Sequence, residues 1–511
     1  MIAKVYSATI LGIEAYPIEI EVDVGRGLPS FSIVGLPDQA VRESKDRVKP
    51  ALKNSGFEFP VKKITVNLAP ADLKKEGPSF DLPIAIGLLA ATKAIKCDRL
   101  ADYFILGELS LDSSLRPVKG ILPTVLKAKS LKKKGVILPE ENAREAALIK
   151  GIDIYPVASL KKAIDFLEGR IEISPFSLEV KDLFKERAIY PVDFDEVAGQ
   201  EHVKRALEVA VSGGHNVLLI GPPGSGKTML ARRLPTILPD ITLGEALETT
   251  KIHSIAGLLN PKEAIVATRP FRSPHHTISD VALIGGGSFP KPGEISLSHN
   301  GVLFLDEFAE FHQDVLEVLR QPLEDGVIHI SRAKGSVSFP ARFMLVGAMN
   351  PCPCGFYTDP KHECTCTPSQ IQKYRAKLSG PLLDRIDLQI EVPGISFCQM
   401  SSEEKKGESS AVIKERVNKA RDVQLERFKE DDIYCNSRMD KSQIKKYCLI
   451  NEESKTLLGL AIDKLGMSAR AYDKILKVAR TIADLEGSSS IETPHISEAI
   501  QYRSLDRRLE V

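Results

Sequence analysis

The 511-residue sequence has no large excess of charge of either sign, because 69 Lys and Arg residues are balanced by 68 Asp and Glu residues. Overall charge therefore neither supports nor excludes a nucleic-acid partner, and any basic surface must be local. No stretch reaches the about 18 consecutive apolar residues of a membrane-spanning helix. The first residues also lack a basic segment leading into an apolar one. These absences predict a cytosolic protein with no membrane partner.

Cysteine is scarce, and repeats are absent. Eight Cys in a chain of this length exclude a small scaffold held together by disulfides. The sequence has no internal repeat and no long low-complexity tract. Its 43% hydrophobic and 27% charged residues are ordinary for a folded protein and exclude a disordered or fibrous chain. At about 150 residues per domain, the length favours about three domains.

The residue pattern changes along the chain in the way that three domains would require. Residues 1–169 alternate strand-like and helical runs and predict an α/β domain, and residues 170–195 have the mixed composition of a linker. Residues 196–393 contain the apolar runs NVLLI, VLFLD and FMLVGAMN, which predict a parallel-sheet nucleotide domain. Residues 394–511 begin polar and continue with apolar residues at helical spacing. They predict a small α-helical domain.

A glycine-rich segment after the run NVLLI carries the most specific signal. It fits the pattern G-x-x-x-x-G-K-[ST] and precedes a predicted helix, as a phosphate-binding loop does. Backbone N–H groups of such a loop cradle phosphates, the Lys reaches the β- and γ-phosphates, and the Thr binds Mg²⁺. The alternative is a glycine-rich turn without a ligand. The candidate residues are Gly221, Pro222, Pro223, Gly224, Ser225, Gly226, Lys227 and Thr228.

Polar residues follow two later apolar runs. GVLFLDE ends in Asp306, expected to hold Mg²⁺, and Glu307, expected to orient the attacking water. FMLVGAMN ends in Asn350, an amide suited to positioning the same water. The alternatives are an acidic helix cap and a turn Asn before a Pro. Together with the glycine-rich loop, these residues predict hydrolysis of ATP with Mg²⁺.

At this point the sequence resembles the AAA+ ATPases. The resemblance implies that Asn350 is sensor 1 and that the segment with Val197 and Gln200 lies near adenine. SGPLLDRID resembles the arginine-finger segment of the magnesium-chelatase and MCM branch, which would place Arg385 against a neighbouring subunit's γ-phosphate. SAR at 468–470 resembles sensor 2, with Arg470 on the same nucleotide. The alternatives are an Arg–Asp surface pair and a solvated helix Arg.

Two further segments resemble inserts of that branch, the helix-2 insert within 268–300 and the hairpin at 327–340. In related helicases such elements face a pore and grip nucleic acid. The resemblance therefore gives candidate DNA contacts. For the adjacent pair His275 and His276, we favour a loop role over a metal site. The candidate phosphate contacts are Arg269, Arg272, Lys291, Arg332 and Lys334.

Four of the eight Cys lie within one short segment, NPCPCGFYTDPKHECTC. Four thiolates could close a tetrahedral Zn²⁺ site beside Asn350. The C-x-C spacing is tighter than the usual C-x₂₋₄-C, and reduced Cys packed in a loop remain the alternative. The remaining Cys are scattered and predict ordinary thiols. The candidate zinc ligands are Cys352, Cys354, Cys364 and Cys366.

The first 169 residues resemble the Lon-protease-type domain that precedes the ATPase module in the ComM/YifB family. KEGPSFD places Ser79 where a Lon-type nucleophile lies. Such a Ser needs a base, which is Lys in that family. The corresponding position here is Leu122, and Lys119 lies three residues earlier. The domain is therefore predicted to be non-proteolytic.

The resemblance to the ComM/YifB family, magnesium-chelatase-like AAA+ proteins, covers essentially the whole chain. It implies an N-terminal Lon-like α/β domain, a central AAA+ parallel-sheet domain and a C-terminal helical lid. It also implies a homo-hexameric motor acting on single-stranded or branched DNA in recombination or natural transformation. The alternative is an ATPase chaperone that remodels a protein partner, as in metal insertion by magnesium chelatase. A regulatory ATPase without motor activity also remains open.

Overall fold

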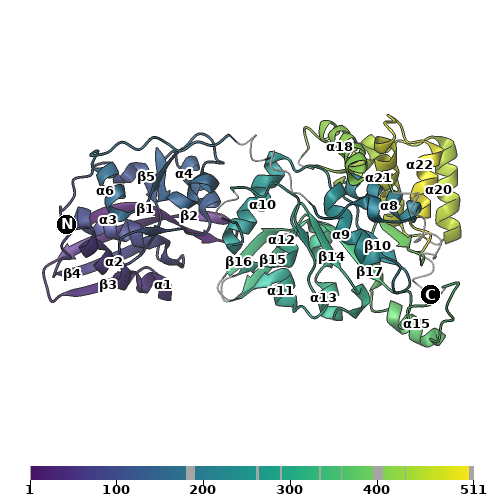
Figure 1. Cartoon of the computed structure of the whole chain (residues 1–511), viewed down its shortest axis with the longest axis horizontal. Coiled ribbons are helices and arrows are strands. Elements are labelled where there is room, and N and C mark those ends of the chain that lie inside the picture. Colours follow the sequence, from purple (N-terminus) through teal and green to yellow (C-terminus); the bar gives the residue numbers. More distant parts are fainter. Residues whose placement is uncertain are drawn as a thin grey trace. The chain divides into compact units, whose positions relative to one another are not determined.

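A computed structural model describes residues 2–179, 184, 190–260, 264–287, 290–332, 335–357, 359–394, 407–431, 433–465 and 467–505 (Figure 1). The chain divides into two compact units. The first comprises Met1–Arg187 and Leu243–Ala267, and the second comprises Ala188–Thr242 and Thr268–Val511. Among the described residues, no helix is both long and apolar enough to cross a membrane.

The first unit is built on a mixed seven-stranded sheet with strand order β3-β4-β2-β1-β5-β8-β9. β1 and β2 form a long antiparallel hairpin, whereas β1, β5, β8 and β9 run parallel. Helix α3 is apolar on all sides, as a helix buried against a sheet must be. The strands are β1 (Ile2–Leu11), β2 (Glu14–Gly25), β3 (Ser30–Val34), β4 (Lys63–Ala69), β5 (Tyr103–Ile105), β6 (Glu108–Leu109), β7 (Leu115–Arg116), β8 (Gly135–Pro139) and β9 (Asp153–Val157).

The helices of the first unit cover its sheet and include one that the sequence placed elsewhere. They are α1 (Gln39–Arg42), α2 (Ser44–Asn54), α3 (Asp81–Ala91), α4 (Ile121–Ser130), α5 (Ala143–Ala146), α6 (Leu160–Leu167) and α10 (Leu243–Ala256). The Ser254 hydroxyl on α10 donates a 2.6 Å hydrogen bond to the buried Glu145 carboxyl, which also accepts the Leu122 N–H. Residues 243–267 thus belong to the first unit, although the sequence-based division put them within 196–393. Local periodicity identifies a helix but not the domain in which it packs.

The second unit contains the expected parallel sheet, with strand order β11-β14-β17-β10-β18. All four pairings between neighbouring strands are parallel, and the three central strands are fully buried, as sheets covered on both faces require. The strands are β10 (Val217–Ile220), β11 (Phe271–Arg272), β14 (Val302–Leu305), β17 (Met344–Met349) and β18 (Leu388–Glu391).

Two short hairpins and several short helices extend from this sheet. The hairpin expected at 327–340 is present as an antiparallel pair of strands with Val327 opposite Pro340. The hairpin strands are β12 (Gly285–Gly286), β13 (Lys291–Pro292), β15 (Val327–Arg332) and β16 (Gly335–Pro340). The helices are α8 (Glu201–Gly213), α9 (Lys227–Ile237), α11 (Asp280–Ile284), α12 (Glu294–Leu297), α13 (Gln313–Glu317), α14 (Arg320–Asp325), α15 (Pro368–Arg375) and α16 (Gly380–Leu383).

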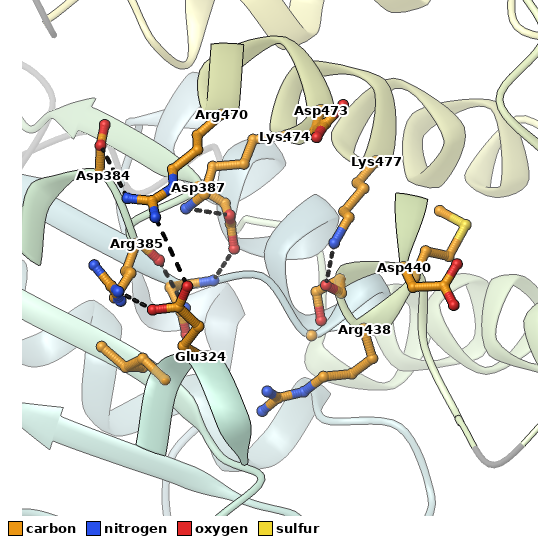
Figure 2. A pocket seen from close by; sticks show the side chains of 15 residues that line it. Glu324, Asp384, Arg385, Asp387, Arg438, Asp440, Arg470, Asp473, Lys474 and Lys477 are labelled. Atoms are coloured by element: carbon orange, nitrogen blue, oxygen red, sulfur yellow. Dashed lines mark hydrogen bonds and ion pairs between the residues drawn. The ribbon is translucent and has the colours of Figure 1, made fainter. Parts of the chain in front are cut away.

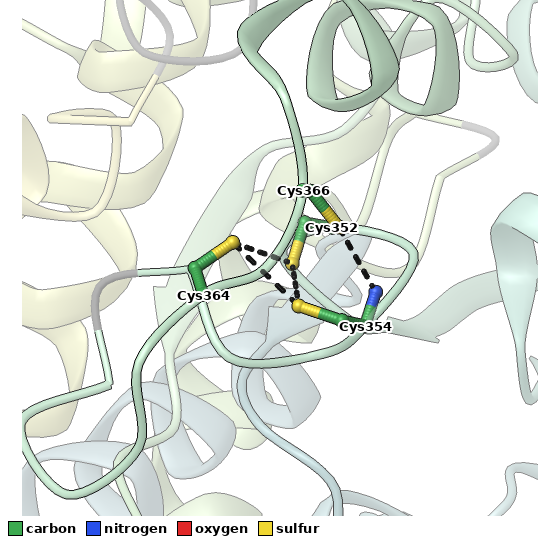
Figure 3. A group of neighbouring side chains, drawn as sticks. All are labelled: Cys352, Cys354, Cys364 and Cys366. Carbon is green, nitrogen blue, oxygen red and sulfur yellow. Dashed lines mark hydrogen bonds between the residues drawn. The ribbon is translucent and has the colours of Figure 1, made fainter.

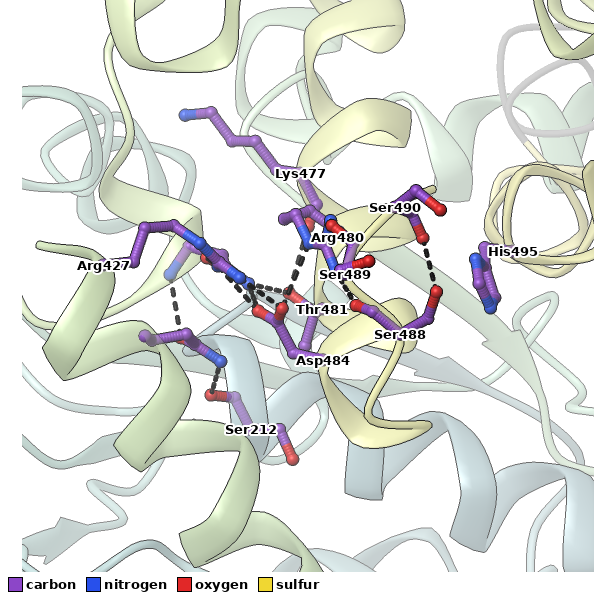
Figure 4. Close-up of polar contacts among 12 residues, drawn as sticks. Ser212, Arg427, Lys477, Arg480, Thr481, Asp484, Ser488, Ser489, Ser490 and His495 are labelled. Carbon is purple, nitrogen blue, oxygen red and sulfur yellow. Dashed lines mark hydrogen bonds and ion pairs between the residues drawn. The ribbon is translucent and has the colours of Figure 1, made fainter. Parts of the chain in front are cut away.

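The C-terminal residues are helical, as the sequence predicted, and they share one hydrophobic core with the parallel sheet. Buried polar contacts also join the C-terminal helices to one another (Figure 4). The Asp484 carboxylate accepts hydrogen bonds from Arg427, Arg480 and Asn436. Removing one partner of such a buried charge cluster leaves the others uncompensated. The helices are α18 (Ser410–Arg427), α19 (Lys441–Tyr447), α20 (Glu452–Leu465), α21 (Ala469–Leu485) and α22 (Thr493–Gln501).

Candidate active site

Three segments with predicted roles follow three adjacent parallel strands. The glycine-rich loop follows β10, Asp306 follows β14 and Asn350 follows β17. Because parallel strands end at one edge of the sheet, these segments meet there, which is where open α/β sheets bind ligands.

The glycine-rich loop has the backbone that phosphate cradling requires. Gly224 and Gly226 have φ values of 74° and 88°, in the left-handed region that favours glycine. A Cβ atom at Gly221 would lie 2.1 Å from the Val392 carbonyl oxygen, so only glycine fits there. Helix α9 begins directly after the loop at Lys227, so its first N–H groups have no partner within the helix and are available to an anion.

The Lys227 ammonium is surrounded by neutral oxygens. It donates hydrogen bonds to the carbonyls of Gly221 and Pro222 at 2.7 and 2.9 Å and to the Asn350 side-chain oxygen at 3.2 Å. Burial lowers the pKa of Lys227 to about 8. A buried cation without close neutralisation by a carboxylate fits an anionic ligand such as a polyphosphate. The hydrogen bond between Lys227 and Asn350 also brings together two residues that are expected to lie at the γ-phosphate.

The expected Mg²⁺ ligands lie next to each other. The Thr228 hydroxyl donates a 2.7 Å hydrogen bond to the Asp306 carboxylate. A hydroxyl and a carboxylate at the end of a phosphate loop are the oxygen ligands that Mg²⁺ takes in phosphoryl-transfer sites. These two residues therefore fit the ion that the sequence implies.

Glu307 contacts a histidine that sequence reasoning did not connect with it. Its backbone is left-handed, with φ 52°, and its carboxylate lies 2.9 Å from the His276 Nδ1 atom. The His276 ring lies tilted against the His275 ring at a centroid distance of 4.1 Å and meets the Phe311 ring edge-on. The loop role favoured for the two histidines thus gains a specific contact. No spacing signal could have linked residues so far apart in the sequence.

Gln200 connects the entry segment to the glycine-rich loop. Its amide nitrogen donates to the carbonyls of Ser225 and Pro393 at 2.9 and 3.0 Å. Its side-chain oxygen is buried and has no hydrogen-bond partner among the described residues. An unsatisfied buried acceptor is costly, and an amino group such as that of adenine would satisfy it. Val197 is fully buried and therefore supports the segment from within the core.

Arg385 and Arg470 lie together in a separate pocket of about 390 Å³ (Figure 2). The Arg385 guanidinium donates to Glu324 on α14 and to the Pro381 carbonyl oxygen at 2.6 Å. Arg470, in the first turn of α21, lies 3.8 Å from Glu324 and 3.7 Å from Asp384. Both arginines are therefore held by carboxylates of their own chain.

This arginine pocket is at the opposite edge of the sheet from the glycine-rich loop. It is lined by Asn216, which precedes β10, and by Asp387, which precedes β18. Asn216 and Gly221 are separated by five residues of extended chain, about 16 Å at about 3.3 Å per residue. A nucleotide held by Lys227 is thus out of reach of both arginines in the same chain. The structure therefore does not bring Arg470 onto the nucleotide of its own chain, where the resemblance to sensor 2 had placed it.

The candidate DNA contacts differ in their placement. The Arg269 guanidinium donates to the carbonyls of Pro239, Asp240 and Asn300, and Arg272 pairs with both Glu294 oxygens at 2.6 and 2.7 Å. These two side chains serve internal contacts. The exposed Lys291 lies on β13, the backbone of Arg332 lies at the end of β15, and Lys334 lies outside the described residues.

The structure also describes the cysteine cluster and Leu122, the residue at the position of the Lon-type lysine. The four sulfur atoms of Cys352, Cys354, Cys364 and Cys366 all lie within 4.8 Å of one another (Figure 3). Leu122 is fully buried at the start of α4, and its side chain has no group that could accept a proton from a serine.

Comparison with known families agrees with this architecture. Residues 193–400 match the model described as magnesium chelatase, subunit ChlI. Residues 20–142 match the subunit ChlI model of Mg-chelatase, and residues 407–503 match the ChlI C-terminal model.

Relatives are similar over the full length. The chain is 46% identical to competence protein ComM of Haemophilus influenzae, covering 100% of this chain and 99% of that protein. It is 45% identical to the protein YifB of Salmonella typhimurium, covering 99% of this chain and 98% of the relative. It is 25% identical to the magnesium-chelatase 38 kDa subunit of Rhodobacter capsulatus over 64% of this chain and 89% of the relative. The chain therefore belongs to the ComM/YifB family of magnesium-chelatase-like AAA+ proteins.

Proposed function

We propose that this protein is an ATP-driven motor that acts on single-stranded or branched DNA as a homo-hexameric ring. One observation carries the proposal. The phosphate-binding residues and the two arginines lie at opposite edges of one sheet, so a complete hydrolytic site needs two chains. A closed ring supplies such an interface to every chain, because head-to-tail contacts repeat around it.

At the carboxyl edge of the sheet, where the parallel strands have their carboxyl ends, the chain binds ATP and orients the attacking water. The N–H groups of the glycine-rich loop and the Lys227 ammonium bind the phosphates of ATP, while Thr228 and Asp306 hold Mg²⁺, which neutralises phosphate charge when bound. Glu307 accepts a hydrogen bond from the attacking water, and Asn350 helps to orient this water toward the γ-phosphate. His276 orients the Glu307 carboxylate through their 2.9 Å contact.

At the amino edge, the chain supplies positive charge to its neighbour. Arg385 and Arg470 stabilise the charge that develops on the neighbour's γ-phosphate during transfer. Within one chain Glu324 holds both arginines, so the neighbour's phosphate competes with that carboxylate. This exchange links the state of the nucleotide to the position of α21 and hence to the lid helices.

DNA is the proposed polymer for two reasons. The first is the full-length similarity to a relative named competence protein ComM. The second is the pair of hairpins in the ATPase unit, one of which carries the exposed Lys291 and the other of which includes Arg332 at the end of β15. Cations on a moving hairpin would grip phosphates without reading sequence.

A second candidate is an ATPase chaperone that remodels a protein partner. The partial similarity to the magnesium-chelatase 38 kDa subunit favours it. The chaperone and the motor require the same nucleotide chemistry and differ in what stimulates turnover.

The test is the Mg²⁺-dependent ATPase rate of the full-length protein with and without single-stranded and branched DNA, with Lys227→Ala as the blank. The motor proposal expects stimulation by DNA and displacement of a strand from the branched substrate. Robust turnover that is unchanged by DNA at low salt would contradict it and favour the chaperone.

A further inference from the structure

The segment between β17 and α15 folds into a compact loop around four thiols. Cys352 is buried and the other three are half-buried. Three separations between sulfur atoms are short: 3.3 Å between Cys352 and Cys354, 3.7 Å between Cys352 and Cys364, and 3.6 Å between Cys354 and Cys364. The fourth sulfur, of Cys366, completes the group within 4.8 Å.

These separations fit a single tetrahedral ion. A Zn²⁺ ion with about 2.3 Å to each sulfur holds its ligands about 3.8 Å apart. A disulfide would need about 2.05 Å, and all four Cys are free thiols. An iron–sulfur cluster with several metal atoms is larger than one ion and holds its thiolates farther apart. The distances thus favour a mononuclear thiolate site over both alternatives.

Backbone donors already point at two of the sulfurs. The Cys354 N–H lies 3.4 Å from the Cys366 sulfur, and the Tyr357 N–H lies 3.3 Å from the Cys352 sulfur. Hydrogen bonds of this kind stabilise the negative charge of a thiolate and orient the ligands of a metal. One of these amides belongs to the first C-x-C pair and the other lies three residues after it, so a C-x-C spacing still leaves backbone donors for the sulfurs.

The same loop packs against the phosphate-binding loop. Gly355 has φ 88°, and a Cβ atom there would lie 2.6 Å from a ring carbon of Pro223. On the other side, Arg375 of α15 donates to the Pro351 carbonyl oxygen and stacks over the Tyr357 ring at 4.9 Å. The cysteine loop, which directly follows Asn350 in the sequence, therefore packs between the glycine-rich loop and α15.

We propose that Cys352, Cys354, Cys364 and Cys366 bind one structural Zn²⁺ ion per chain, and that the resulting zinc loop fixes the wall of the nucleotide site behind Pro223. Binding releases the thiol protons to solvent and leaves four thiolates on the metal. All four ligand positions are filled by protein, so the ion is structural and takes no part in hydrolysis. The link to ATP turnover rests on the proposed function, whereas the metal site does not.

Metal analysis of the purified, reduced full-length protein tests the site directly. The proposal expects about one zinc atom per chain, little iron, and release of the zinc when the thiols are titrated with a mercurial reagent. Wild-type protein that contains no zinc and binds none when Zn²⁺ is added would overturn the proposal. Iron in place of zinc would overturn it as well.

Matched variants separate ligands from other thiols. Cys364→Ser combined with Cys366→Ser should weaken zinc binding by more than about 100-fold. Cys435→Ser, which removes a half-buried thiol outside the cluster, should keep the full zinc content. Equal zinc content in both variants would overturn the assignment. Since zinc content is measured without ATP, a failure here is distinct from a failure of the ATPase proposal.

Measurements of nucleotide binding then test whether the zinc loop supports the phosphate-binding loop. Wild-type protein stripped of zinc by a chelator should bind a fluorescent ATP analogue about tenfold more weakly than the reloaded protein. Unchanged affinity after verified removal of zinc would overturn the proposed support of the phosphate-binding loop and leave only the metal site.

Discussion

The two edges of the parallel sheet in the second unit carry different halves of one expected active site. At the carboxyl edge the candidate residues already contact one another, as Lys227 does Asn350 and Thr228 does Asp306. At the amino edge, Arg385 and Arg470 contact carboxylates of their own chain instead. Within one chain, the phosphate-binding residues therefore contact one another, whereas the two arginines lie away from them. Under the proposed function, a neighbouring chain would supply the arginine half of the site.

The largest expected effect is at the carboxyl edge. Lys227→Ala removes the buried ammonium among the neutral oxygens and should abolish nucleotide binding, measured by titration with a fluorescent ATP analogue. Lys291→Ala, an exposed lysine in the same unit, is the control and should bind as wild type does. Tight binding by Lys227→Ala would mean that the loop is not the phosphate site.

A change at the amino edge should separate binding from turnover. Arg385→Ala should leave ATP affinity intact while lowering the ATPase rate by about 10³-fold, because the arginine stabilises charge only during transfer. Steady-state kinetics together with analogue binding measure both quantities. Turnover at the wild-type rate would remove Arg385 from the site.

A smaller effect is expected from a positioning residue. His276→Ala should lower kcat about tenfold and leave the KM for ATP unchanged, because the exposed Glu307 loses the contact that orients it. His276→Gln, which can still donate a hydrogen bond, should recover part of the rate. His275→Ala, which removes the neighbouring ring, should stay near wild type. A raised KM with normal kcat would instead indicate a role in binding.

The smallest expected effect is at the hairpins. Lys291→Ala should weaken DNA binding and lower the slope of log affinity against log salt by about one. Lys291→Arg keeps the charge and should keep the slope. An unchanged slope in Lys291→Ala would place the DNA elsewhere.

The sequence predicted the carboxyl edge well because its chemistry is local. The glycine-rich loop, Asp306 and Asn350 each directly follow a recognisable apolar strand, and the ends of parallel strands meet. Lys227 and Asn350 were both assigned to the region of the γ-phosphate, and in the structure their side chains are 3.2 Å apart. The parallel sheet and the C-terminal helices are confirmed for the same reason.

Tertiary contacts explain what the sequence did not predict. Glu307 contacts His276, which follows a different strand of the sheet. Both arginines of the pocket pair with Glu324, and nothing in the sequence of its helix α14 indicates that role. Arg269 was proposed as a DNA contact because its segment resembles a pore-facing insert, but its guanidinium donates to carbonyl groups that are distant in sequence. Helix α10 likewise packs in the first unit through Ser254 and Glu145.

The measurement that tests the shared site most directly is the ATPase rate of mixed variants. Lys227→Ala and Arg385→Ala should each be inactive, but mixed rings contain interfaces with both intact halves. A random equal mixture should regain about a quarter of the wild-type rate. Mixing Lys227→Ala with Glu307→Gln is the control and should regain nothing, since both residues belong to the same edge. No recovery in the first mixture, despite proven subunit exchange, would contradict a site completed between chains.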